Sequence, residues 1–220
     1  KELNKLKILI TAGASIEKID PVRYISNHSS GIQGYEIAKS LSLHGAEVIL
    51  VKGNTNIETP RNIRIMEASS AKDFYEKVSD ELPFDVFISA AAISDWRIEK
   101  FSKNKIKKNN NEKLKMNFLR NIDVLKKISN NKLRPKLVIG FSAETSNLIT
   151  NSKKKLTEKN CDWIVANNVG NEEVFGSNYN KVSLITKTKT DHWPKMKKSE
   201  VAKKISKEIV NFFKKNRLIS

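Results

Sequence analysis

The sequence has little cysteine and no long apolar run, and each shortage excludes a class of protein. Cys161 is the only cysteine among 220 residues, so no internal disulfide can form, as is usual in a reducing cytosol. No stretch approaches the ~18 consecutive apolar residues of a membrane-spanning helix. The first residues are charged and lead directly into a strand-like run, unlike a signal peptide. We therefore predict a cytoplasmic chain with no membrane partner, in which Cys161 is a small core residue.

The charge of the chain is strongly one-sided. Lys and Arg number 41 against 24 Asp and Glu, which gives a formal net charge of +17. Such an excess is typical of proteins that bind polyanions. The lysines are spread along the whole chain, however, and no module combines basic and aromatic residues as single-strand binders do. A basic nucleic-acid-binding module remains an alternative, but small polyanionic substrates explain the charge more economically, and we predict no nucleic-acid partner.

Apolar runs alternate with helical patterns along the chain. Runs typical of buried strands occupy residues 7–11, 47–51, 63–66, 85–88, 136–141 and 162–166. Helical periodicity falls between them, at residues 35–44, 71–82, 121–130 and 146–159. Repeated strand–helix units predict an α/β, Rossmann-like, doubly wound fold with a mostly parallel sheet and helices on both faces. We expect a single domain over residues 1–220.

Two segments depart from this alternation. Residues 94–118 are rich in Lys and Asn and lack a helical period, which predicts a long mobile loop or a loose hairpin. Residues 181–197 alternate like a half-exposed strand and then reach His192-Trp193-Pro194, which predicts a late antiparallel extension. We take this extension as a candidate dimer contact. An amphipathic helix is expected over residues 199–214.

The loop after the first predicted strand is the most informative part of the chain. Gly13 ends that strand, and Ser29, Ser30 and Gly31 open the next helix. Ligands of open parallel sheets bind beyond the carboxyl ends of the strands. Small residues at a helix N-terminus let backbone amides approach an anion there. A tight turn would use the same residues, so the pattern alone leaves both interpretations open.

The glycine spacing disfavours an ordinary dinucleotide-binding fold. Gly13 and Gly34 lie about twenty residues apart, whereas the usual fingerprint places three glycines within about six residues. Lys52 and Gly53 follow the second strand, where an acidic residue would hold a ribose. An NAD(P)-dependent Rossmann-fold reductase nevertheless remains the rival enzyme, because the fold alone permits it.

Five ordered blocks of the sequence resemble one family. They read Asp-Pro-Val-Arg-Tyr-Ile-Ser-Asn-His-Ser-Ser-Gly at 20–31, Ala-Ala-Ala-Ile-Ser-Asp-Trp-Arg at 90–97, Lys-Ile-Lys-Lys at 105–108, Gly-Phe-Ser-Ala-Glu-Thr at 140–145 and Ala-Asn at 166–167. These blocks are similar to motifs of the bacterial phosphopantothenate–cysteine ligases. They span nearly the whole chain, so the resemblance is specific.

The resemblance implies a two-step reaction of coenzyme A biosynthesis. The carboxylate of 4'-phosphopantothenate attacks the α-phosphate of CTP, which releases pyrophosphate and leaves an acyl-cytidylate. The amine of cysteine then displaces CMP and forms an amide. Mg²⁺ is expected with the triphosphate, although its protein ligands are unknown. Such chemistry asks the protein mainly for positioning and charge stabilisation.

The resemblance also implies roles for individual residues. Asn27 would hold the acyl-cytidylate carbonyl, and Lys105 would reach the triphosphate from a lid formed by residues 94–118, so these two are the expected catalytic residues. The expected substrate-binding residues are Gly13, Arg23, Ser29, Ser30, Gly31 and Ala92. The expected nucleotide-binding residues are Ser89, Ala90, Ala91, Asp95, Lys105, Asn121, Ile122, Asp123, Val124, Phe141, Lys155 and Lys159.

Taken singly, these residues also have ordinary structural explanations. Asn27 suits an Asx turn, and Arg23 suits a surface salt bridge. Asp95 could cap a helix or turn, and Phe141 could belong to the core. Lys105 lies among many lysines that are simply solvated.

The chain departs from the family motifs at several positions. Ile16 stands where the family has an Arg, and Ile32-Gln33 replaces Lys-Met between two glycines. Ile122 replaces a Pro, and Asn168 replaces an Asp. These changes bear on substrate affinity more than on the reaction class. The choice between CTP and ATP is left open by the sequence.

The resemblance further implies partners. Members form homodimers, and bacterial members are often the second half of a chain that begins with a flavin-dependent phosphopantothenoylcysteine decarboxylase. The sequence does not begin with Met, as we would expect of a piece cut from such a chain. No decarboxylase motif is present, so no flavin is predicted for this portion.

Overall fold

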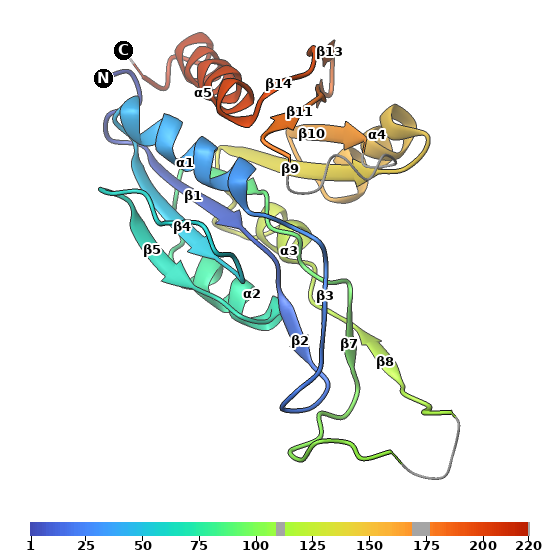
Figure 1. The fold of residues 1–220 in the computed structure, drawn as a ribbon. Coiled ribbons are helices and arrows are strands. Elements are labelled where there is room, and N and C mark those ends of the chain that lie inside the picture. Colours follow the sequence, from blue (N-terminus) through green and yellow to red (C-terminus); the bar gives the residue numbers. More distant parts are fainter. Residues whose placement is uncertain (109–112, 169–176, 220) are drawn as a thin grey trace.

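Eight strands of the protein form one twisted sheet, in a computed structural model that describes residues 1–108, 113–168 and 177–219. The strands are β1 (Lys7–Ala12), β4 (Glu47–Lys52), β5 (Arg64–Glu67), β6 (Val86–Ser89), β9 (Leu137–Glu144), β10 (Trp163–Asn168), β12 (Val182–Thr186) and β13 (Thr190–His192). Their order across the sheet is β13-β12-β10-β9-β6-β1-β4-β5 (Figure 1). The pairings from β10 to β5 are parallel, whereas β12 and β13 are antiparallel. The predicted α/β fold with a late antiparallel addition is confirmed.

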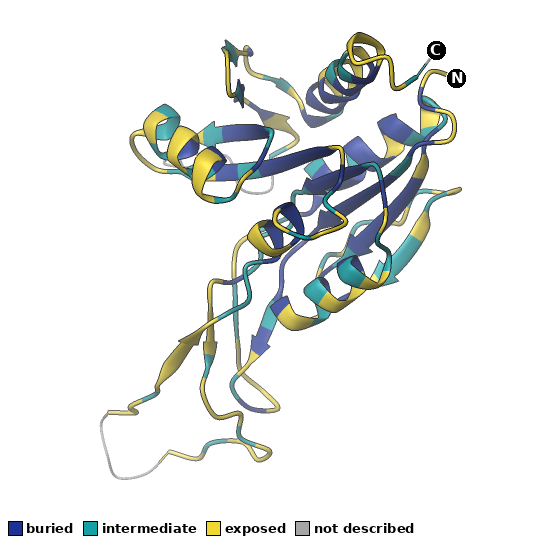
Figure 2. Cartoon of the chain, turned by 180° about the vertical axis from the view of Figure 1, so that it is seen from behind, coloured by how far each residue is buried: buried dark blue, intermediate teal, exposed yellow. Residues whose placement is uncertain are grey.

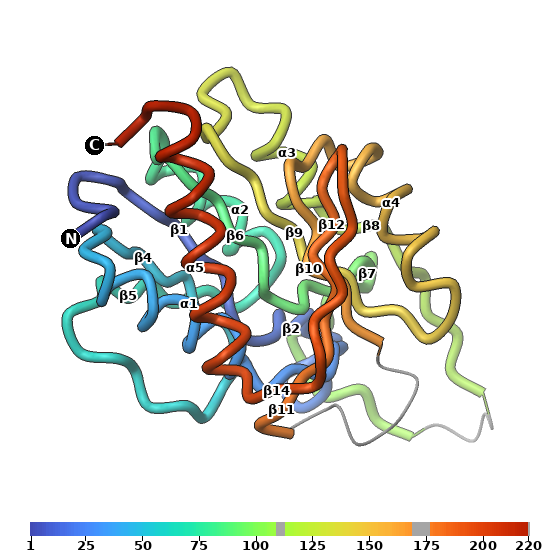
Figure 3. The backbone as a smooth tube through the Cα atoms, turned by 90° about the horizontal axis from the view of Figure 1, so that it is seen from above, coloured from blue at the N-terminus to red at the C-terminus, as the bar shows by residue number. Residues whose placement is uncertain are grey.

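Helices cover both faces of the sheet. On one face α1 (Ile32–Leu43) and α5 (Lys198–Lys215) lie side by side, as Figure 3 shows. The other face carries α2 (Ala71–Asp80), α3 (Val124–Ser129) and α4 (Leu148–Glu158). Side chains of a strand alternate between the two faces. Accordingly, Ile8 and Ile10 pack toward α1, while Leu9 packs toward α2.

Local sequence signals set the ends of two of the helices. Gly45 has a φ of 93° and follows α1 as predicted, since a left-handed residue commonly ends a helix. Ser70 and Asp73 form a reciprocal capping box at the start of α2, which satisfies backbone N–H groups that the helix leaves free. Such signals explain why these helices begin and end close to the predicted residues.

A long arm projects from the body of the protein (Figure 1). It consists of residues 16–26 and the described part of 96–120. The first segment forms a ribbon of β2 (Ile16–Lys18) and β3 (Tyr24–Ser26). The second begins and ends in a ribbon of β7 (Trp96–Ile98) and β8 (Phe118–Arg120). The loop expected over 94–118 is therefore anchored by a hairpin at its base, and its residues 109–112 lie outside the described residues.

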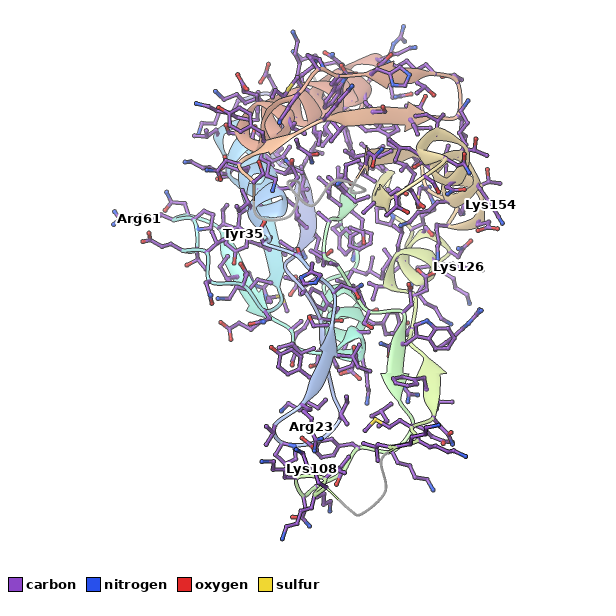
Figure 4. All side chains as sticks on the ribbon, turned by 45° about the vertical axis from the view of Figure 1, so that its right-hand side comes forward. Arg23, Tyr35, Arg61, Lys108, Lys126 and Lys154 are labelled. Atoms are coloured by element: carbon purple, nitrogen blue, oxygen red, sulfur yellow. The ribbon has the colours of Figure 1, made fainter. Side chains whose placement is uncertain are left out.

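The buried carboxylate of Asp20 joins the two segments of the arm. It accepts hydrogen bonds from the backbone N–H of Val22, Arg23 and Ile106, at 2.8, 2.8 and 3.1 Å. Arg23 pairs with it at 2.5 Å and also donates to the Ile106 carbonyl at 2.7 Å. Burial alone would raise the pKa of Asp20, but these donors hold it well below its usual range. Figure 4 shows Arg23 beside Lys108 at the end of the arm.

A third short ribbon connects the antiparallel edge to the last helix. It pairs β11 (Tyr179–Asn180) with β14 (Met196–Lys197), directly before α5. The predicted extension over 181–197 thus contains β12, β13 and β14.

The strand order reverses direction between β1 and β6. From β1 the chain builds outward through β4 and β5, and from β6 it builds the other way through β9 and β10. Ligands of open α/β sheets bind at such a switch point. The loops that leave β1 and β6 stay together beyond the sheet, because Ala92 N–H donates to the Gly13 carbonyl at 2.8 Å and Ser94 N–H donates to Ser15 Oγ at 2.9 Å.

Candidate active site

Two adjoining cavities open at this switch point. The larger, of about 810 Å³, lies between the loop after β6, the start of α3 and one side of α4, and we call it the α4 cavity. The smaller, of about 580 Å³, lies against the N-terminus of α1, and we call it the α1 cavity. Both are lined by Ala91, Ile93, Asp95, Phe141 and Lys155. These five residues form a shared rim at which two bound molecules could meet.

Hydrogen bonds fix the wall of the α4 cavity. Asn121 Nδ2 donates to the Ser94 carbonyl at 2.8 Å, and its backbone N–H donates to the Asp95 carbonyl at 2.8 Å. Asp123 caps α3 by accepting from the Lys126 N–H at 3.0 Å. The Asp123 carboxylate also forms an ion pair with Lys159 of α4. The cavity wall is therefore held by residues from three separate parts of the chain.

Two lysines bring positive charge to this cavity. Lys155 lies in the last turn of α4 and Lys159 is its C-terminal cap, and both line the cavity. Burial lowers the pKa of Lys155, and the nearby Lys159 ammonium lowers it further. A bound polyanion would offset both effects. The site is thus suited to the phosphates of a nucleotide.

The α1 cavity faces the start of a helix whose N-cap residue, Gly31, has no side chain to cap it. Gly31, the residue before α1, has a φ of 76°, a conformation that favours glycine. A Cβ atom on Gly34 would lie 2.6 Å from Ala12 Cβ, so this glycine allows α1 to approach β1 closely. Helix N-termini attract anions through their free N–H groups. The geometry supports the anion-binding interpretation of this loop.

Asn27 lies on the wall of the α1 cavity near the shared rim. Its Nδ2 donates to the Ile93 carbonyl at 3.3 Å, which links the β3–α1 loop to the loop after β6. The neighbouring Ser26 fixes the backbone by donating from Oγ to the Ser15 carbonyl at 2.7 Å. Asn27 Nδ2 carries two N–H groups, and the only described acceptor of this amide is the Ile93 carbonyl, so the second N–H can donate to a ligand carbonyl.

The structure brings most of the predicted site residues to the two cavities. Those on the α4 cavity are Ser89, Ala91, Asp95, Asn121, Ile122, Asp123, Val124, Phe141, Lys155 and Lys159. Those on the α1 cavity are Asn27, Ser29, Ser30, Gly31, Ala90, Ala91, Ala92, Asp95, Phe141 and Lys155. The predicted roles of these residues remain predictions, but their convergence is now a structural fact.

Three predicted residues line neither cavity. Gly13 lies behind the α1 cavity, where a Cβ atom on Gly31 would approach its backbone nitrogen to 3.3 Å. Arg23 is paired with Asp20 in the arm, which is the structural alternative considered for it. Lys105 is exposed on the arm, so this single chain does not bring it to Asn27.

Other lining residues were not anticipated. Arg120 and Trp96 stack at 5.7 Å beside the α4 cavity, and both are in the ribbon at the base of the arm. Gln33 and Lys198 line the α1 cavity. Lys198 is one of many lysines in a basic chain, and only its burial distinguishes it. The sequence carried no signal of that burial.

Cys161 is a core residue, as predicted. Its side chain is fully buried between β10 and α4, and burial raises the pKa of its thiol to about 12. A thiol that stays protonated is a poor nucleophile.

Comparison with known proteins agrees with this geometry. The sequence pattern of the DNA/pantothenate metabolism flavoprotein C-terminal domain matches residues 3–213. The chain belongs to this family. Coenzyme A biosynthesis bifunctional protein CoaBC of Borreliella burgdorferi is 41% identical over 93% of this chain and 52% of its own length. The chain thus spans about half the length of the curated relatives it matches.

Solved structures extend the comparison to the fold. The crystal structure of the C-terminal domain of CoaBC is 36% identical, with a TM-score of 0.82 over 97% of this chain and 98% of that one. A Cab2 H337A mutant in complex with phosphopantothenate-cysteine has a TM-score of 0.77 over 96% of this chain and 88% of that one. At 15% identity, this second likeness shows the fold alone. The chain is a homologue of the phosphopantothenoylcysteine synthetase half of CoaBC, and the family predicted from the sequence blocks is confirmed.

Four of the five sequence blocks of this flavoprotein C-terminal domain meet at the two cavities. Block 20–31 ends at the α1 cavity, and block 90–97 forms much of the shared rim. Blocks 140–145 and 166–167 contribute Phe141 and Asn167 from the ends of β9 and β10. Only block 105–108 lies elsewhere, on the arm.

Among the residues that the structure describes, no helix is both long enough and apolar enough to cross a membrane. Within the same residues, no three or more His, Cys, Asp or Glu side chains gather where they could hold a metal ion.

Proposed function

We propose that this domain joins 4'-phosphopantothenate to cysteine through an acyl-cytidylate, using CTP and releasing pyrophosphate and CMP. The observation that carries the proposal is the pair of cavities with a shared rim at Ala91, Ile93, Asp95, Phe141 and Lys155. A reaction between a carboxylate and an α-phosphate needs two large polar molecules held end to end. One cavity for each molecule, and one rim between them, meets that need.

The nucleotide is assigned to the α4 cavity. Lys155 and Lys159 would hold its phosphates, and Asn121 with the start of α3 would contact the nucleoside through backbone groups. The acid substrate is assigned to the α1 cavity, with its carboxylate at the rim. In this arrangement Lys155 stabilises the negative charge that develops as the carboxylate attacks phosphorus. Asn27 holds the carbonyl of the acyl-cytidylate while the cysteine amine displaces CMP.

Mg²⁺ is assigned to the nucleotide rather than to a cage of protein ligands. Mg²⁺ is commonly bound through one or two carboxylates together with substrate phosphates. Asp95, Asp123 and Glu158 line the α4 cavity, but Asp123 is engaged by Lys159 and Glu158 by Lys154. Asp95 is therefore the residue of this chain best placed to contact the ion, which would neutralise phosphate charge.

We further propose a homodimer that forms through the arm. Among the described residues, the exposed large apolar side chains on the arm are Val22, Tyr24, Trp96, Phe101, Leu114, Phe118 and Leu119. Figure 2 shows the arm as largely exposed, in contrast to the buried sheet. Apolar surface gathered in this way is typical of an interface. It favours the arm over the 181–197 extension as the dimer contact.

Changing Phe101, which is 51% exposed, to aspartate should convert dimers into monomers in analytical ultracentrifugation. Leu133→Asp is the matched control, because Leu133 is 54% exposed but lies in the loop between α3 and β9, outside the arm. In such a dimer, Lys105 of one chain would act at the cavities of the other chain. Mixing Asn27→Ala chains with Lys105→Ala chains should then restore activity. A monomeric wild type would refute the dimer, and mixed chains without activity would refute the action of Lys105 across it.

The curated relatives suggest a further partner and a location. CoaBC is described as bifunctional, and this chain matches about half of it. We infer that a flavin-dependent decarboxylase half accompanies this domain, as part of the same chain or as a separate one, and that both are cytoplasmic. Co-purification of a flavin-containing protein with the native domain, seen by its visible absorbance, would test this association.

A thermal-shift comparison tests the function against its rivals. A ligand that binds the folded state raises the melting temperature in proportion to the logarithm of its concentration. CTP with Mg²⁺ should raise it, whereas NADPH and a DNA oligomer should leave it unchanged. A rise with NADPH alone would favour the reductase, and a rise with DNA alone would favour the nucleic-acid-binding module. Substituting ATP for CTP decides which base the α4 cavity accepts.

A further inference from the structure

Lys198 is a buried lysine whose ammonium has no partner among the described residues. It is the first residue of α5, only 7% exposed, and its side chain lines the α1 cavity. Its ammonium makes no hydrogen bond or ion pair with any described residue. Its backbone is held on both sides, because its N–H donates to the Asn178 carbonyl at 2.8 Å and its carbonyl accepts from Gln33 Nε2 at 3.1 Å. The backbone of Lys198 is therefore held in place, while no described residue neutralises the charge of its ammonium.

An unpaired ammonium in this position is costly for the folded protein. Burial lowers the pKa of Lys198, and no acidic group in the described part of the chain raises it again. Buried charges in proteins are usually paired or bound to a ligand. If Lys198 only filled space, replacing it with methionine would not lower the stability of the protein, since the two side chains are similar in length. The missing partner therefore points to a bound anion.

A second feature of the same cavity points to an anion as well. Ser29, Ser30 and Gly31 line it at the N-terminus of the 12-residue helix α1. The N-cap residue is a glycine without a side chain, and Ser29 and Ser30 Oγ accept only from the N–H groups of Gly31 and Ile32, at 3.3 and 3.5 Å, so the next N–H groups of the first turn have no side-chain cap. The only carboxylate among the described lining residues is Asp95, and Asp95 lies on the shared rim. Away from the rim, positive charge faces an anion from two sides, from Lys198 and from the N-terminus of α1.

Gln33 supports this arrangement in a way specific to this chain. Gln33 occupies a position where the family has methionine, and its side-chain amide donates to the Lys198 carbonyl. Gln33 thereby connects α1 directly to the first residue of α5. Gln33 lines the same cavity, although its Oε1 is buried without a hydrogen bond to any described residue.

We propose that Lys198 and the N-terminus of α1 form a phosphate subsite that binds the phosphomonoester end of the acid substrate. This inference rests on the proposed function and deepens it. The α4 cavity has its own cations, Lys155 and Lys159, for the nucleotide phosphates. A phosphate anchored at Lys198 fixes one end of the acid substrate in the α1 cavity and leaves its carboxylate free to reach the rim. Lys198 is thus a positioning and specificity residue.

The test compares phosphorylated and unphosphorylated substrate in Lys198→Met and wild-type enzyme. A hydrogen bond to a charged group changes affinity on the order of 10- to 100-fold. Lys198→Met should lower kcat/KM for 4'-phosphopantothenate by about that factor and leave kcat/KM for pantothenate and the KM for CTP unchanged. Lys203→Met is the matched control, because Lys203 is exposed on the same helix. Lys198→Arg should retain most of the phosphate preference.

Stability provides an independent measurement. Removing an unpaired buried charge should keep or raise the melting temperature of the ligand-free protein, whereas loss of a structural contact would lower it. Inorganic phosphate should raise the melting temperature of wild type more than that of Lys198→Met. If wild type is an active ligase but Lys198→Met keeps its full phosphate preference, the subsite is refuted and the function stands. If wild type has no ligase activity, the function fails, and the phosphate titration still decides the subsite.

Discussion

Replacing Asn27 with alanine is expected to lower the rate of the complete ligase reaction by about 10²–10³-fold, the loss typical of removing one donor to a developing charge. The structure places Asn27 on the α1 cavity and fixes its amide through the Ile93 carbonyl of the shared rim. The side chain can therefore be oriented before the intermediate forms. Its loss should reduce turnover while leaving binding of CTP, measured by thermal shift, unchanged.

The control for this variant is Asn56→Ala. Asn56 is exposed and lines neither cavity, so its loss should leave turnover at the wild-type level. Separate assays of pyrophosphate release and of amide formation would locate the affected step. Wild-type rates of both steps in Asn27→Ala would remove this residue from the mechanism.

Replacing Lys155 with methionine is the second large change, with an expected loss of about 10²-fold in kcat/KM for CTP. Lys155 lines both cavities, and its ammonium is partly buried beside Lys159. In the free protein this arrangement lowers the pKa of Lys155, because burial and the charge of Lys159 disfavour its charged form. A bound anion would favour that form again. Methionine keeps the apolar part of the side chain and removes only the charge.

Lys154→Met tests whether this effect depends on position or merely on net charge. Lys154 is the adjacent residue of α4, its side chain is 73% exposed, and it forms an exposed ion pair with Glu158 at 3.7 Å. Its loss should change kcat/KM by less than about twofold, because exposed ion pairs contribute little. Equal losses in the two variants would mean that a diffuse positive field, rather than Lys155 at the rim, attracts the nucleotide. Melting temperatures that fall only in Lys155→Met would indicate a structural role instead.

The parallel sheet could be predicted from the sequence because each of its central strands is buried on both faces. Such strands read as continuous apolar runs, and β1, β4, β6 and β9 all do so. The arm could not be predicted in the same way. The β2–β3 ribbon is short and polar, and Asp20 holds it to Ile106, which is 86 residues away. A contact over that separation leaves no periodic pattern.

The site was predictable to the extent that its residues follow strands of the switch point. The small residues of 90–92 come directly after β6, and the glycines at 31 and 34 lie at α1, so elementary rules place them together. The resemblance added Lys155 and Lys159. Lys198 could not be predicted as a site residue. It differs from the other lysines by its burial at the start of α5, and nothing in a lysine-rich sequence marks one lysine as buried.

The central claim is that the acid group and the nucleotide α-phosphate react directly at the rim of the two cavities. Turnover of phosphopantothenate labelled with ¹⁸O in its carboxylate tests this claim most directly. Attack on the α-phosphate leaves one carboxylate oxygen on phosphorus, so the released CMP should carry ¹⁸O when analysed by mass spectrometry. Unlabelled CMP or CDP beside ¹⁸O-labelled inorganic phosphate would mean that the γ-phosphate activates the acid, and the account would be wrong.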